Sequence, residues 1–384
     1  MTYQGFGNGS DGAATLSGTD APVDSSCSGT SGTKSLSATN ASFASEKLLL
    51  IHQSRGTGCG NWEINIIDSY SVGTITTLFD LVNTYTDSGQ SQAQVIQLPE
   101  YSSVTISGTL TAKAWDGNVG GIIAFLCNGD TTISGTVTAK GRGFQGGQGT
   151  RTGSPSQWGI AGEGNTASYA GLGNTSNNGS GGGAGNYDGG NRAAGGGGGS
   201  HSEIGEDGVD VGGGNFGGGY QAGVGGTGGQ DITGTSTLSN MTFGGGGGSS
   251  VWATSSNNSC IAGGNGGGII FILTSSIVVT GSINADGDKG IDGVDSSNRY
   301  GGSGSGAGGS IYIVAIQVNI GTNLLSANGG IATASGSGLI GGGGKGGKGR
   351  IYISTCSLSG TTNQGNFNYD AGGQDFCQSF ISIY

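Results

Sequence analysis

The chain has few charged residues, few prolines and few histidines. Of its 384 residues only 10% are charged, three are prolines and two are histidines. The formal net charge of −11 argues against a phosphate backbone as partner, because such binding needs lysine and arginine. No apolar stretch reaches the roughly 18 residues that a membrane helix needs. We therefore expect neither a nucleic-acid partner nor membrane insertion.

Motifs for catalysis and cofactor binding are also missing. The sequence contains no GxSxG elbow, no HExxH helix and no phosphate loop ending in Lys-Ser or Lys-Thr. No glutamate falls on the repeated strands described below, so these strands lack the paired carboxylates of glycan hydrolases. His52 follows an apolar run and is typical of a buried strand residue rather than a base. These absences predict a protein that is not an enzyme and needs no cofactor.

The six cysteines include no CxxC pair, which makes a zinc site improbable. An even number of cysteines in a chain rich in Gly, Ser, Thr and Asn suits an extracellular surface, where disulfides form. Free buried thiols are the alternative. The local pairings that we predict are Cys27–Cys59 and Cys356–Cys377, with Cys127–Cys260 left as the third.

Glycine is the residue in excess, with 91 of 384 positions. Collagen would need glycine at every third position together with abundant proline, and three prolines exclude it. Disordered chains combine low hydrophobicity with high charge. This chain instead has little charge and short apolar runs such as GIIAFL (121–126) and SIYIVAI (310–316). We therefore expect an ordered protein.

The sequence contains a pair of strand motifs that recurs along the chain between the glycine-rich stretches. Residues 104–114 alternate apolar and polar side chains with the period of two that a half-buried strand shows. Successive similar strands with small inward residues favour a parallel β-solenoid with stacked rungs. The first strand recurs as GIIAF (121–125), GIIFI (268–272), GSIYI (309–313) and GRIYI (349–353). The second recurs as VTAKG (137–141), INADG (283–287) and LSANG (325–329).

The predicted fold class is all-β, with parallel β-solenoid-like rungs, a long glycine-rich insertion and an N-terminal β module. The module has fewer glycines, and its apolar runs predict an antiparallel unit, either a small barrel or a cap over the first rung. The expected divisions are an extended Gly/Ser/Thr-rich arm at 1–34, the β module at 35–103, solenoid-like repeats at 104–141 and 267–355, the insertion at 142–266, and a C-terminal β segment at 356–384.

The insertion is too rich in GGx motifs to be a helix or an ordinary sheet. With glycine inside, extended helices of polyproline-II shape can pack at short range and hydrogen-bond across neighbours. Side chains that interrupt the glycine runs would then be displayed outward, and a floppy surface loop is the alternative. The candidates for receptor binding are Tyr187, His201, Asn215, Phe216 and Tyr220.

An acidic cluster follows one repeated strand in ADGDKGIDGVD (285–295). Carboxylate and carbonyl oxygens at this spacing could hold Ca²⁺, although the sequence has neither the EF-hand pattern nor tandem calcium-binding nonapeptides. A solvated acidic turn is the alternative, and EIGEDGVD (203–210) is a similar, weaker candidate. The candidate ligands are Asp286, Asp288, Asp292 and Asp295.

Two resemblances to known proteins add to these expectations. The motifs LPEYSSVTISGTLTAKAWDGNVGGIIAF, GGGIIFI…VVTGSINADG and GGKGRIYI resemble glycine-rich β-solenoid surface proteins of bacteria and phages, over roughly residues 35–360. The GGx-rich stretch at about 142–266 resembles, in composition, the distal tail-fibre adhesins of T-even-like phages. That second resemblance implies packed polyglycine-II helices supporting variable loops that touch a host receptor. The glycine blocks of those adhesins are more regular than the blocks here.

The features together predict a non-enzymatic structural or adhesive protein that is extracellular, on a cell surface or on a virion. Its partner would be a surface glycan or a receptor protein, and it would form a homo-oligomer or assemble with other structural subunits. One alternative is a self-assembling fibre or sheath subunit, joined through its N-terminal arm or exposed rungs. A second alternative is ice or mineral binding by threonine rows such as Thr109/Thr111 and Thr136/Thr138.

Overall fold

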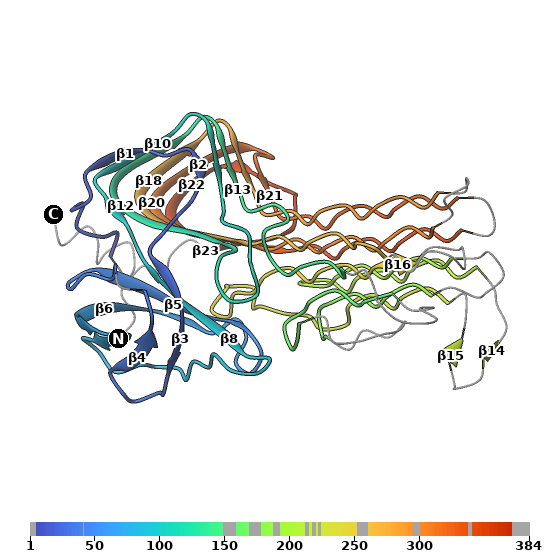
Figure 1. Cartoon of the computed structure of the whole chain (residues 1–384). Helices are drawn as coiled ribbons and strands as arrows, with labels where there is room; N and C mark the ends of the chain where they lie inside the picture. Colours follow the sequence, from blue (N-terminus) through green and yellow to red (C-terminus); the bar gives the residue numbers. More distant parts are fainter. Residues whose placement is uncertain are drawn as a thin grey trace.

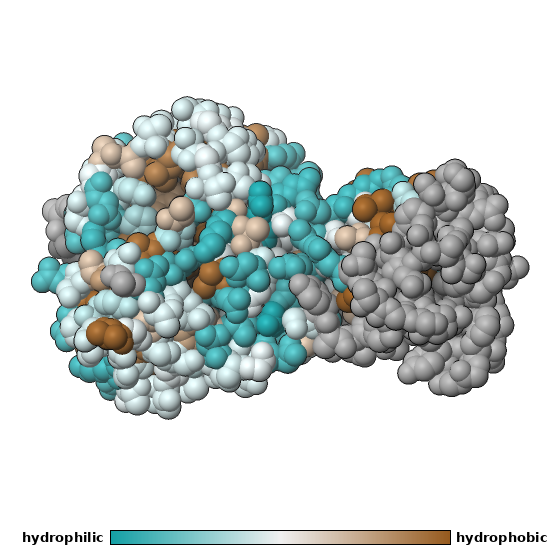
Figure 2. Space-filling view, viewed as in Figure 1, coloured by the Kyte–Doolittle hydropathy of each residue, from teal (hydrophilic) through white to brown (hydrophobic). Residues whose placement is uncertain are grey.

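The protein is all-β in the part of the chain that the computed structural model describes, and that part contains no helix. Figure 1 shows an antiparallel barrel, two parallel sheets beside it, and a long bundle of extended segments that projects from them. In the space-filling view from the same side, hydrophilic and hydrophobic residues are interspersed over the barrel and the sheets (Figure 2). The described residues are 5–40, 42–148, 159–168, 178–186, 193–211, 215–216, 220–221, 224–251, 260–294, 300–336 and 340–370.

Two parallel sheets carry the repeated strands. In the larger sheet the order is β1 (Ala13–Thr15), β10 (Ser103–Ile106), β12 (Ile122–Ile133), β18 (Ile269–Val279), β20 (Ser310–Thr322), β22 (Arg350–Thr361) and β23 (Asn366–Asp370), and β9 (Glu100–Tyr101) also pairs with β12. In the smaller sheet the order is β2 (Gly18–Thr19), β11 (Thr109–Thr111), β13 (Thr136–Thr138), β19 (Ser282–Asn284) and β21 (Leu325–Ser326).

The repeats pair in register, so the parallel pairing predicted from the sequence is confirmed. Equivalent residues of successive repeats lie side by side and are buried in one core between the two sheets. The row in the larger sheet is Ile123, Ile270, Ile311 and Ile351. The row in the smaller sheet is Leu110, Val137, Ile283 and Leu325.

The central strands of the larger sheet are apolar on both faces. In β12, Ile123 and Phe125 belong to the core between the sheets, whereas Ile122 and Leu126 belong to a second core shared with the barrel. A strand buried on both faces shows a continuous apolar run instead of alternation. This explains why the sequence there shows no period of two.

The barrel is closed and antiparallel, and it packs on a face of the larger sheet. Leu48, Leu50 and Ile64 of the barrel share a core with Ile122 and Phe271 of the sheet. It therefore does not cover the end of the sheet, as a cap over the first rung would. The strands in order around the barrel are β3 (Asp24–Gly29), β4 (Ser35–Ala38), β7 (Thr74–Thr77), β6 (Trp62–Ser71), β5 (Leu48–Arg55) and β8 (Gln92–Gln97).

The N-terminal segment is built into the fold, so the expected extended arm at 1–34 is wrong for the residues described. β1 pairs with β10, β2 pairs with β11, and β3 is a strand of the barrel. An unpaired sheet edge leaves backbone N–H and C=O groups without partners. Pairing of β1 and β2 therefore covers the edges that β10 and β11 would otherwise expose.

Trp62 joins the barrel to a row of aromatic rings on the sheet. Phe271 and Tyr312 stack with ring centroids 5.1 Å apart, and Tyr312 stacks on Tyr352 at 5.5 Å. The Trp62 ring meets Phe271 and Tyr312 at steep angles, with centroid distances of 5.3 and 5.5 Å. Edge-to-face aromatic pairs of this kind add about 0.5–1.5 kcal/mol each beyond the area they bury.

The glycine-rich stretches form the bundle, in which extended segments lie side by side (Figure 1). Twelve segments fall within the described ranges, and successive segments run in opposite directions. In chain order they are g1 (143–148), g2 (159–164), g3 (178–186), g4 (193–201), g5 (203–210), g6 (224–230), g7 (243–251), g8 (260–267), g9 (285–293), g10 (300–309), g11 (327–335) and g12 (340–349).

Segment g4 shows how the interior of the bundle is held together. Along residues 195–200 the backbone N–H groups donate in turn to g5, g10 and g3, and then to the same three segments again. Their carbonyl oxygens accept in turn from g6, g12 and g7, with the same repeat of three. The N···O distances for the six donors lie between 2.8 and 3.2 Å. Segment g4 therefore has six neighbours and bonds to each of them at every third residue.

Segments g7 and g10 are surrounded in the same way. The neighbours of g7 are g1, g2, g3, g4, g8 and g10. The neighbours of g10 are g4, g7, g8, g9, g11 and g12. Among the twelve described segments, g4, g7 and g10 thus contact one another and the other nine enclose them, which is hexagonal packing of rods.

The number of neighbours explains where glycine is required. At each glycine from 195 to 199 a Cβ atom would fall on the backbone of an adjacent segment; at Gly198 it would meet the carbonyl of Lys345. None of these five glycines has a positive φ, so glycine is needed there for space and not for its backbone freedom. In the outer segment g5, only Gly205 and Gly208 are buried within 204–210, at a spacing of three.

Substitution of Gly198 by Ala tests this packing. We expect Gly198→Ala to lower the free energy of unfolding by about 1–3 kcal/mol or more, because an added methyl group pushes two backbones apart. The measurement is urea unfolding followed by tryptophan fluorescence. Lys345→Ala, on the neighbouring segment, is the control and should change stability by no more than about 0.5 kcal/mol. Equal stability of Gly198→Ala and the parent chain would contradict the packing.

Candidate functional site

The far end of the bundle is where the chain reverses between outgoing and returning segments. Segments g1, g3, g5, g7, g9 and g11 run away from the parallel sheets, and the segment that follows each one returns (Figure 1). Near this end two short antiparallel ladders are described. One joins β14 (Asn215–Phe216) to β15 (Tyr220–Gln221), and the other joins β16 (Ser250–Val251) to β17 (Cys260–Ile261).

Three of the five predicted receptor-binding residues belong to one of these ladders. Phe216 pairs with Tyr220, and Asn215 pairs with Gln221. The backbone thus brings Asn215, Phe216 and Tyr220 together at the end of the bundle farthest from the sheets (Figure 1). Tyr187 lies outside the described residues.

His201 is fully buried, so the expectation that it is displayed outward is wrong. Its Nε2 lies 3.1 Å from the carbonyl oxygen of Thr242 and 3.2 Å from Ser310 Oγ. Burial, together with the nearby charge of Arg350, lowers its pKa to about 3. His201 is at the inner end of g4, an interior segment, and a side chain at that place is enclosed by the neighbouring segments.

His52 is buried as well, in the barrel strand β5. Its Nδ1 lies 2.9 Å from Ser54 Oγ and its Nε2 lies 2.7 Å from the carbonyl oxygen of Met241. Burial lowers its pKa to about 4. Sequence reasoning expected a buried strand histidine here, and the structure agrees.

The predicted calcium ligands make separate contacts. Asp286 accepts from the N–H of Asn328 at 2.6 Å. Asp292 accepts from Lys289 Nζ at 2.7 Å, and that hydrogen bond lowers the pKa of Asp292. Burial raises the pKa of Asp288, and Asp295 lies outside the described residues. In the described ranges no group of three His, Cys, Asp or Glu side chains could hold a metal ion.

Two of the predicted disulfides are wrong, because Cys27, Cys59 and Cys127 are free thiols. Cys27 is in the core of the barrel, and Cys127 is in the core between the sheets. Cys59 packs against the core shared by barrel and sheet. Three separate cores thus hold these thiols apart. The pairing of Cys356 with Cys377 stays a prediction, since Cys377 lies outside the described residues.

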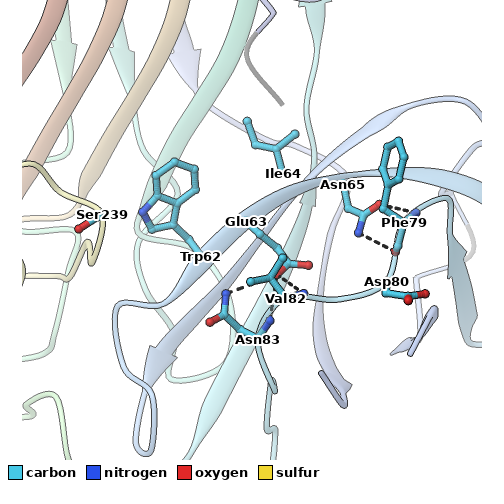
Figure 3. A pocket seen from close by; sticks show the side chains of 9 residues that line it. All are labelled: Trp62, Glu63, Ile64, Asn65, Phe79, Asp80, Val82, Asn83 and Ser239. Atoms are coloured by element: carbon cyan, nitrogen blue, oxygen red, sulfur yellow. Dashed lines mark hydrogen bonds between the residues drawn. The ribbon is translucent and has the colours of Figure 1, made fainter. Parts of the chain in front are cut away.

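A pocket that sequence reasoning missed lies at the junction of the barrel and the base of the bundle (Figure 3). Its volume is about 240 Å³. It is made by the start of β6, the loop that follows β7, and Ser239 in the loop between g6 and g7. We call it the Glu63 pocket. Its lining residues are Trp62, Glu63, Ile64, Asn65, Phe79, Asp80, Val82, Asn83 and Ser239.

Comparisons with known proteins add no assignment to this geometry. No family model matches the chain, and no curated protein matches it. The described residues contain no helix that is long and apolar enough to cross a membrane.

The two buried histidines predict a loss of stability in mild acid. Each is neutral when folded, with a pKa lowered to about 4 for His52 and about 3 for His201. The unfolded chain takes up protons near pH 6.5, so the stabilisation is complete above that pH and declines as the pH falls toward 4. The expected decline is about 1.4 kcal/mol per histidine for each pH unit in this range.

Urea unfolding at pH 7 and pH 5 measures this effect. His201→Gln should reduce the difference in unfolding free energy between the two pH values, whatever the stability of the variant at pH 7. An unchanged difference in His201→Gln would contradict a buried, neutral histidine at this position.

Proposed function

We propose that this chain is a non-enzymatic structural and adhesive protein that acts on the outside of a virion or cell. The two parallel sheets would be the rungs of a β-solenoid-like scaffold. Segments g1 to g12 would be a polyglycine-II bundle that carries a receptor-binding surface at its far end. The observation that supports this best is the six-neighbour backbone bonding of g4, g7 and g10.

An interior built from main-chain groups has a direct consequence for binding. Five consecutive glycines of g4 contribute no side chains, and neither do the five of g7 at 244–248. The bundle therefore acts as a stiff support, and the chemistry for recognition must come from its outer face and its far end. Binding surfaces held rigidly in advance lose little entropy when a partner is bound.

The sequence between outgoing and returning segments contains the aromatic residues that such a surface would use. These residues are Trp158, Tyr187, Phe216, Tyr220 and Trp252. Tyrosine and tryptophan offer a large contact area with few rotatable bonds, and their rings can stack on sugars. We infer that the partner is a surface glycan or a receptor protein contacted through these connections.

The location outside the cell rests on shape and not on disulfides. The free thiols of Cys27, Cys59 and Cys127 remove one reason for placing the chain in an oxidising compartment. The long bundle that projects from the sheets and barrel is instead the form expected of a protein that reaches toward a surface (Figure 1).

Single substitutions in the β14–β15 ladder test the adhesive function. We expect Phe216→Ala or Tyr220→Ala to weaken binding to the receptor-bearing surface about tenfold or more, since aromatic residues carry most of the energy at such contacts. A glycan array followed by cell-binding measurements would show this. Tyr369→Ala, an exposed tyrosine on β23, is the control and should bind like the parent chain. Unchanged binding in both ladder variants, with melting temperatures preserved, would contradict the assignment.

A fibre or sheath subunit is the second candidate, and one observation favours it. Within the described residues, β1 and β23 are the end strands of the larger sheet and β2 and β21 those of the smaller one, each with one neighbour only. Such edges can pair with another chain. β1 and β2 are already paired within the chain, so they do not supply a free arm for the joint.

Negative-stain electron microscopy at several protein concentrations separates the two candidates. The adhesive function predicts discrete particles of constant size. Regular filaments that lengthen with concentration would instead favour the fibre subunit.

A further inference from the structure

The segment between g6 and g7 is bound to the barrel on one side and to the larger sheet on the other. We call its residues 232–242 the strap. The indole N–H of Trp62 in β6 donates to the carbonyl oxygen of Leu238 at 2.9 Å. The Nε–H of Arg350 in β22 donates to the carbonyl oxygen of Thr233 at 3.0 Å. The strap therefore connects three parts of the molecule, since it also leads into the bundle.

Two buried histidines hold consecutive carbonyl groups at the end of the strap. His52 Nε2 lies 2.7 Å from the carbonyl oxygen of Met241, and His201 Nε2 lies 3.1 Å from that of Thr242. Both rings are fully buried. A carbonyl oxygen only accepts, so each neutral ring carries its proton on Nε2. His52 belongs to the barrel and His201 to g4, and the strap is fastened to both.

The other nitrogen of each ring is poorly placed to take up a proton. His52 Nδ1 lies 2.9 Å from Ser54 Oγ, which also accepts from Gln94 Nε2 at 2.8 Å. The hydroxyl proton of Ser54 is therefore the donor to His52 Nδ1. Within the part of the chain that the structure describes, His201 Nδ1 is buried without a hydrogen-bond partner. A proton added at Nδ1 would meet a donor in one ring and lack an acceptor in the other.

The charges around the histidines do not favour an imidazolium. Burial, together with the charge of Arg350, lowers the pKa of His201 to about 3. Burial lowers the pKa of His52 to about 4, and among the described residues no acidic side chain raises the pKa of either ring. Glu203 is two residues from His201, but it pairs with Lys348 at 3.3 Å. Both rings therefore lack a counter-charge.

The ion pair of Arg55 and Glu163 is the buried charge pair at the base of the bundle. Burial raises the pKa of Glu163. A carboxyl group with a raised pKa binds its proton more tightly in the folded chain, so it favours the folded state as the pH falls. Acid therefore acts on the strap through the two histidines and not through this pair.

The backbone of the strap is strained in the closed position. Leu238 has a φ of 52°, a left-handed conformation that residues other than glycine rarely adopt. Its side chain is fully buried in the core shared by barrel and sheet. Such a conformation persists only where the surrounding contacts hold it. The exposed residues of the strap are Ile232, Thr235, Ser236, Thr237 and Ser239.

We propose that the strap is a pH-sensitive device, closed when His52 and His201 are neutral and released in acid, when both rings take up protons and reach water. Release uncovers Leu238 and Met241, which belong to the core shared by barrel and sheet. The inference goes beyond the adhesive function and does not depend on it, because it concerns how the bundle is attached to the barrel and the larger sheet.

Proton uptake determines the size of the effect. In the released strap each histidine has an ordinary pKa of about 6.5. In the closed strap the pKa is about 4 for His52 and about 3 for His201. Closure is therefore complete above about pH 6.5 and is lost as the pH falls toward 4. Between pH 7 and pH 5 the ratio of released to closed strap should rise about 25-fold for each histidine and about 600-fold for both.

Hydrogen exchange of the full chain at pH 7 and pH 5, corrected for the chemical exchange rate at each pH, measures the release. The N–H of Thr233 donates to the carbonyl oxygen of His201 at 2.7 Å, and that of Met241 donates to Gly60 at 2.8 Å. We expect the opening constant of peptides covering the strap to rise about 600-fold. At pH 5 these peptides should exchange at least about tenfold faster than the core strand β18.

Variants of the histidines locate the titration. His52→Gln and His201→Gln keep a donor for the strap carbonyl but do not titrate, so each should reduce the pH effect to about 25-fold. Asn368→Ala is the control, because Asn368 Nδ2 donates to the carbonyl oxygen of Ser236 at 3.3 Å and carries no titrating group. It should raise release by the same factor at both pH values and leave the ratio of about 600 unchanged.

The parent chain decides the test if the glutamine variants do not fold. It contains two histidines, so both imidazole signals can be followed by NMR during a pH titration. We expect them to take up protons together with a change in the indole N–H signal of Trp62, which reports the contact with Leu238.

Four results would overturn the proposal. Equal opening of the strap at pH 7 and pH 5 would show that acid does not release it. Exchange of the strap at the rate of β18 at both pH values would show that it opens only when the whole chain unfolds. The full pH effect in both glutamine variants would show that other groups titrate. Imidazoles that titrate near pH 6.5 without a change at Trp62 would show that their protonation leaves the strap closed.

Discussion

The hydrogen bond between backbones of neighbouring glycine segments is the interaction on which the bundle depends. The extended segment g4 makes no backbone hydrogen bonds within itself along residues 195–200, so its buried N–H and C=O groups need partners on other segments. In g4 these partners come from six segments, and the repeat of three residues returns each bond to the same neighbour. No segment could be stable in this form alone. The entropic cost of ordering so many glycines is thus offset only when the whole bundle assembles.

Charged and aromatic contacts at the base of the bundle attach it to the barrel. Arg55 of β5 forms an ion pair with Glu163 of g2, and both side chains are almost fully buried. The Trp115 indole N–H donates to Glu163 at 3.0 Å, and the N–H of Gln145 in g1 donates to it at 3.0 Å. Burial raises the pKa of Glu163, and the Arg55 charge opposes that change. A buried pair with this many partners fixes the position of g1 and g2 on the barrel, because breaking it would leave an uncompensated charge.

Local patterns in the sequence predicted the scaffold, and non-local contacts account for what they missed. The glycine-led apolar strands predicted the parallel register because equivalent residues, such as Ile123 and Ile270, repeat along the chain. The burial of His201 depends on the place of g4 in the middle of the bundle, which only the pairing of distant segments determines. The free thiol of Cys127 likewise follows from the packing of two sheets. The Glu63 pocket is lined both by residues of β6 and by Ser239, which is distant in the sequence, and no local sequence motif predicts this contact.

Hydrogen exchange of the glycine amides in g4 tests the central claim most directly. If the backbone bonds of 195–200 hold the interior of the bundle, these amides exchange only when the whole bundle opens, as slowly as the amides in the core strand β18. The same rates should be found by NMR or by mass spectrometry of peptides covering g4. Exchange within seconds, as in an exposed glycine loop, would contradict the account and show that the glycine-rich segments are not packed against one another.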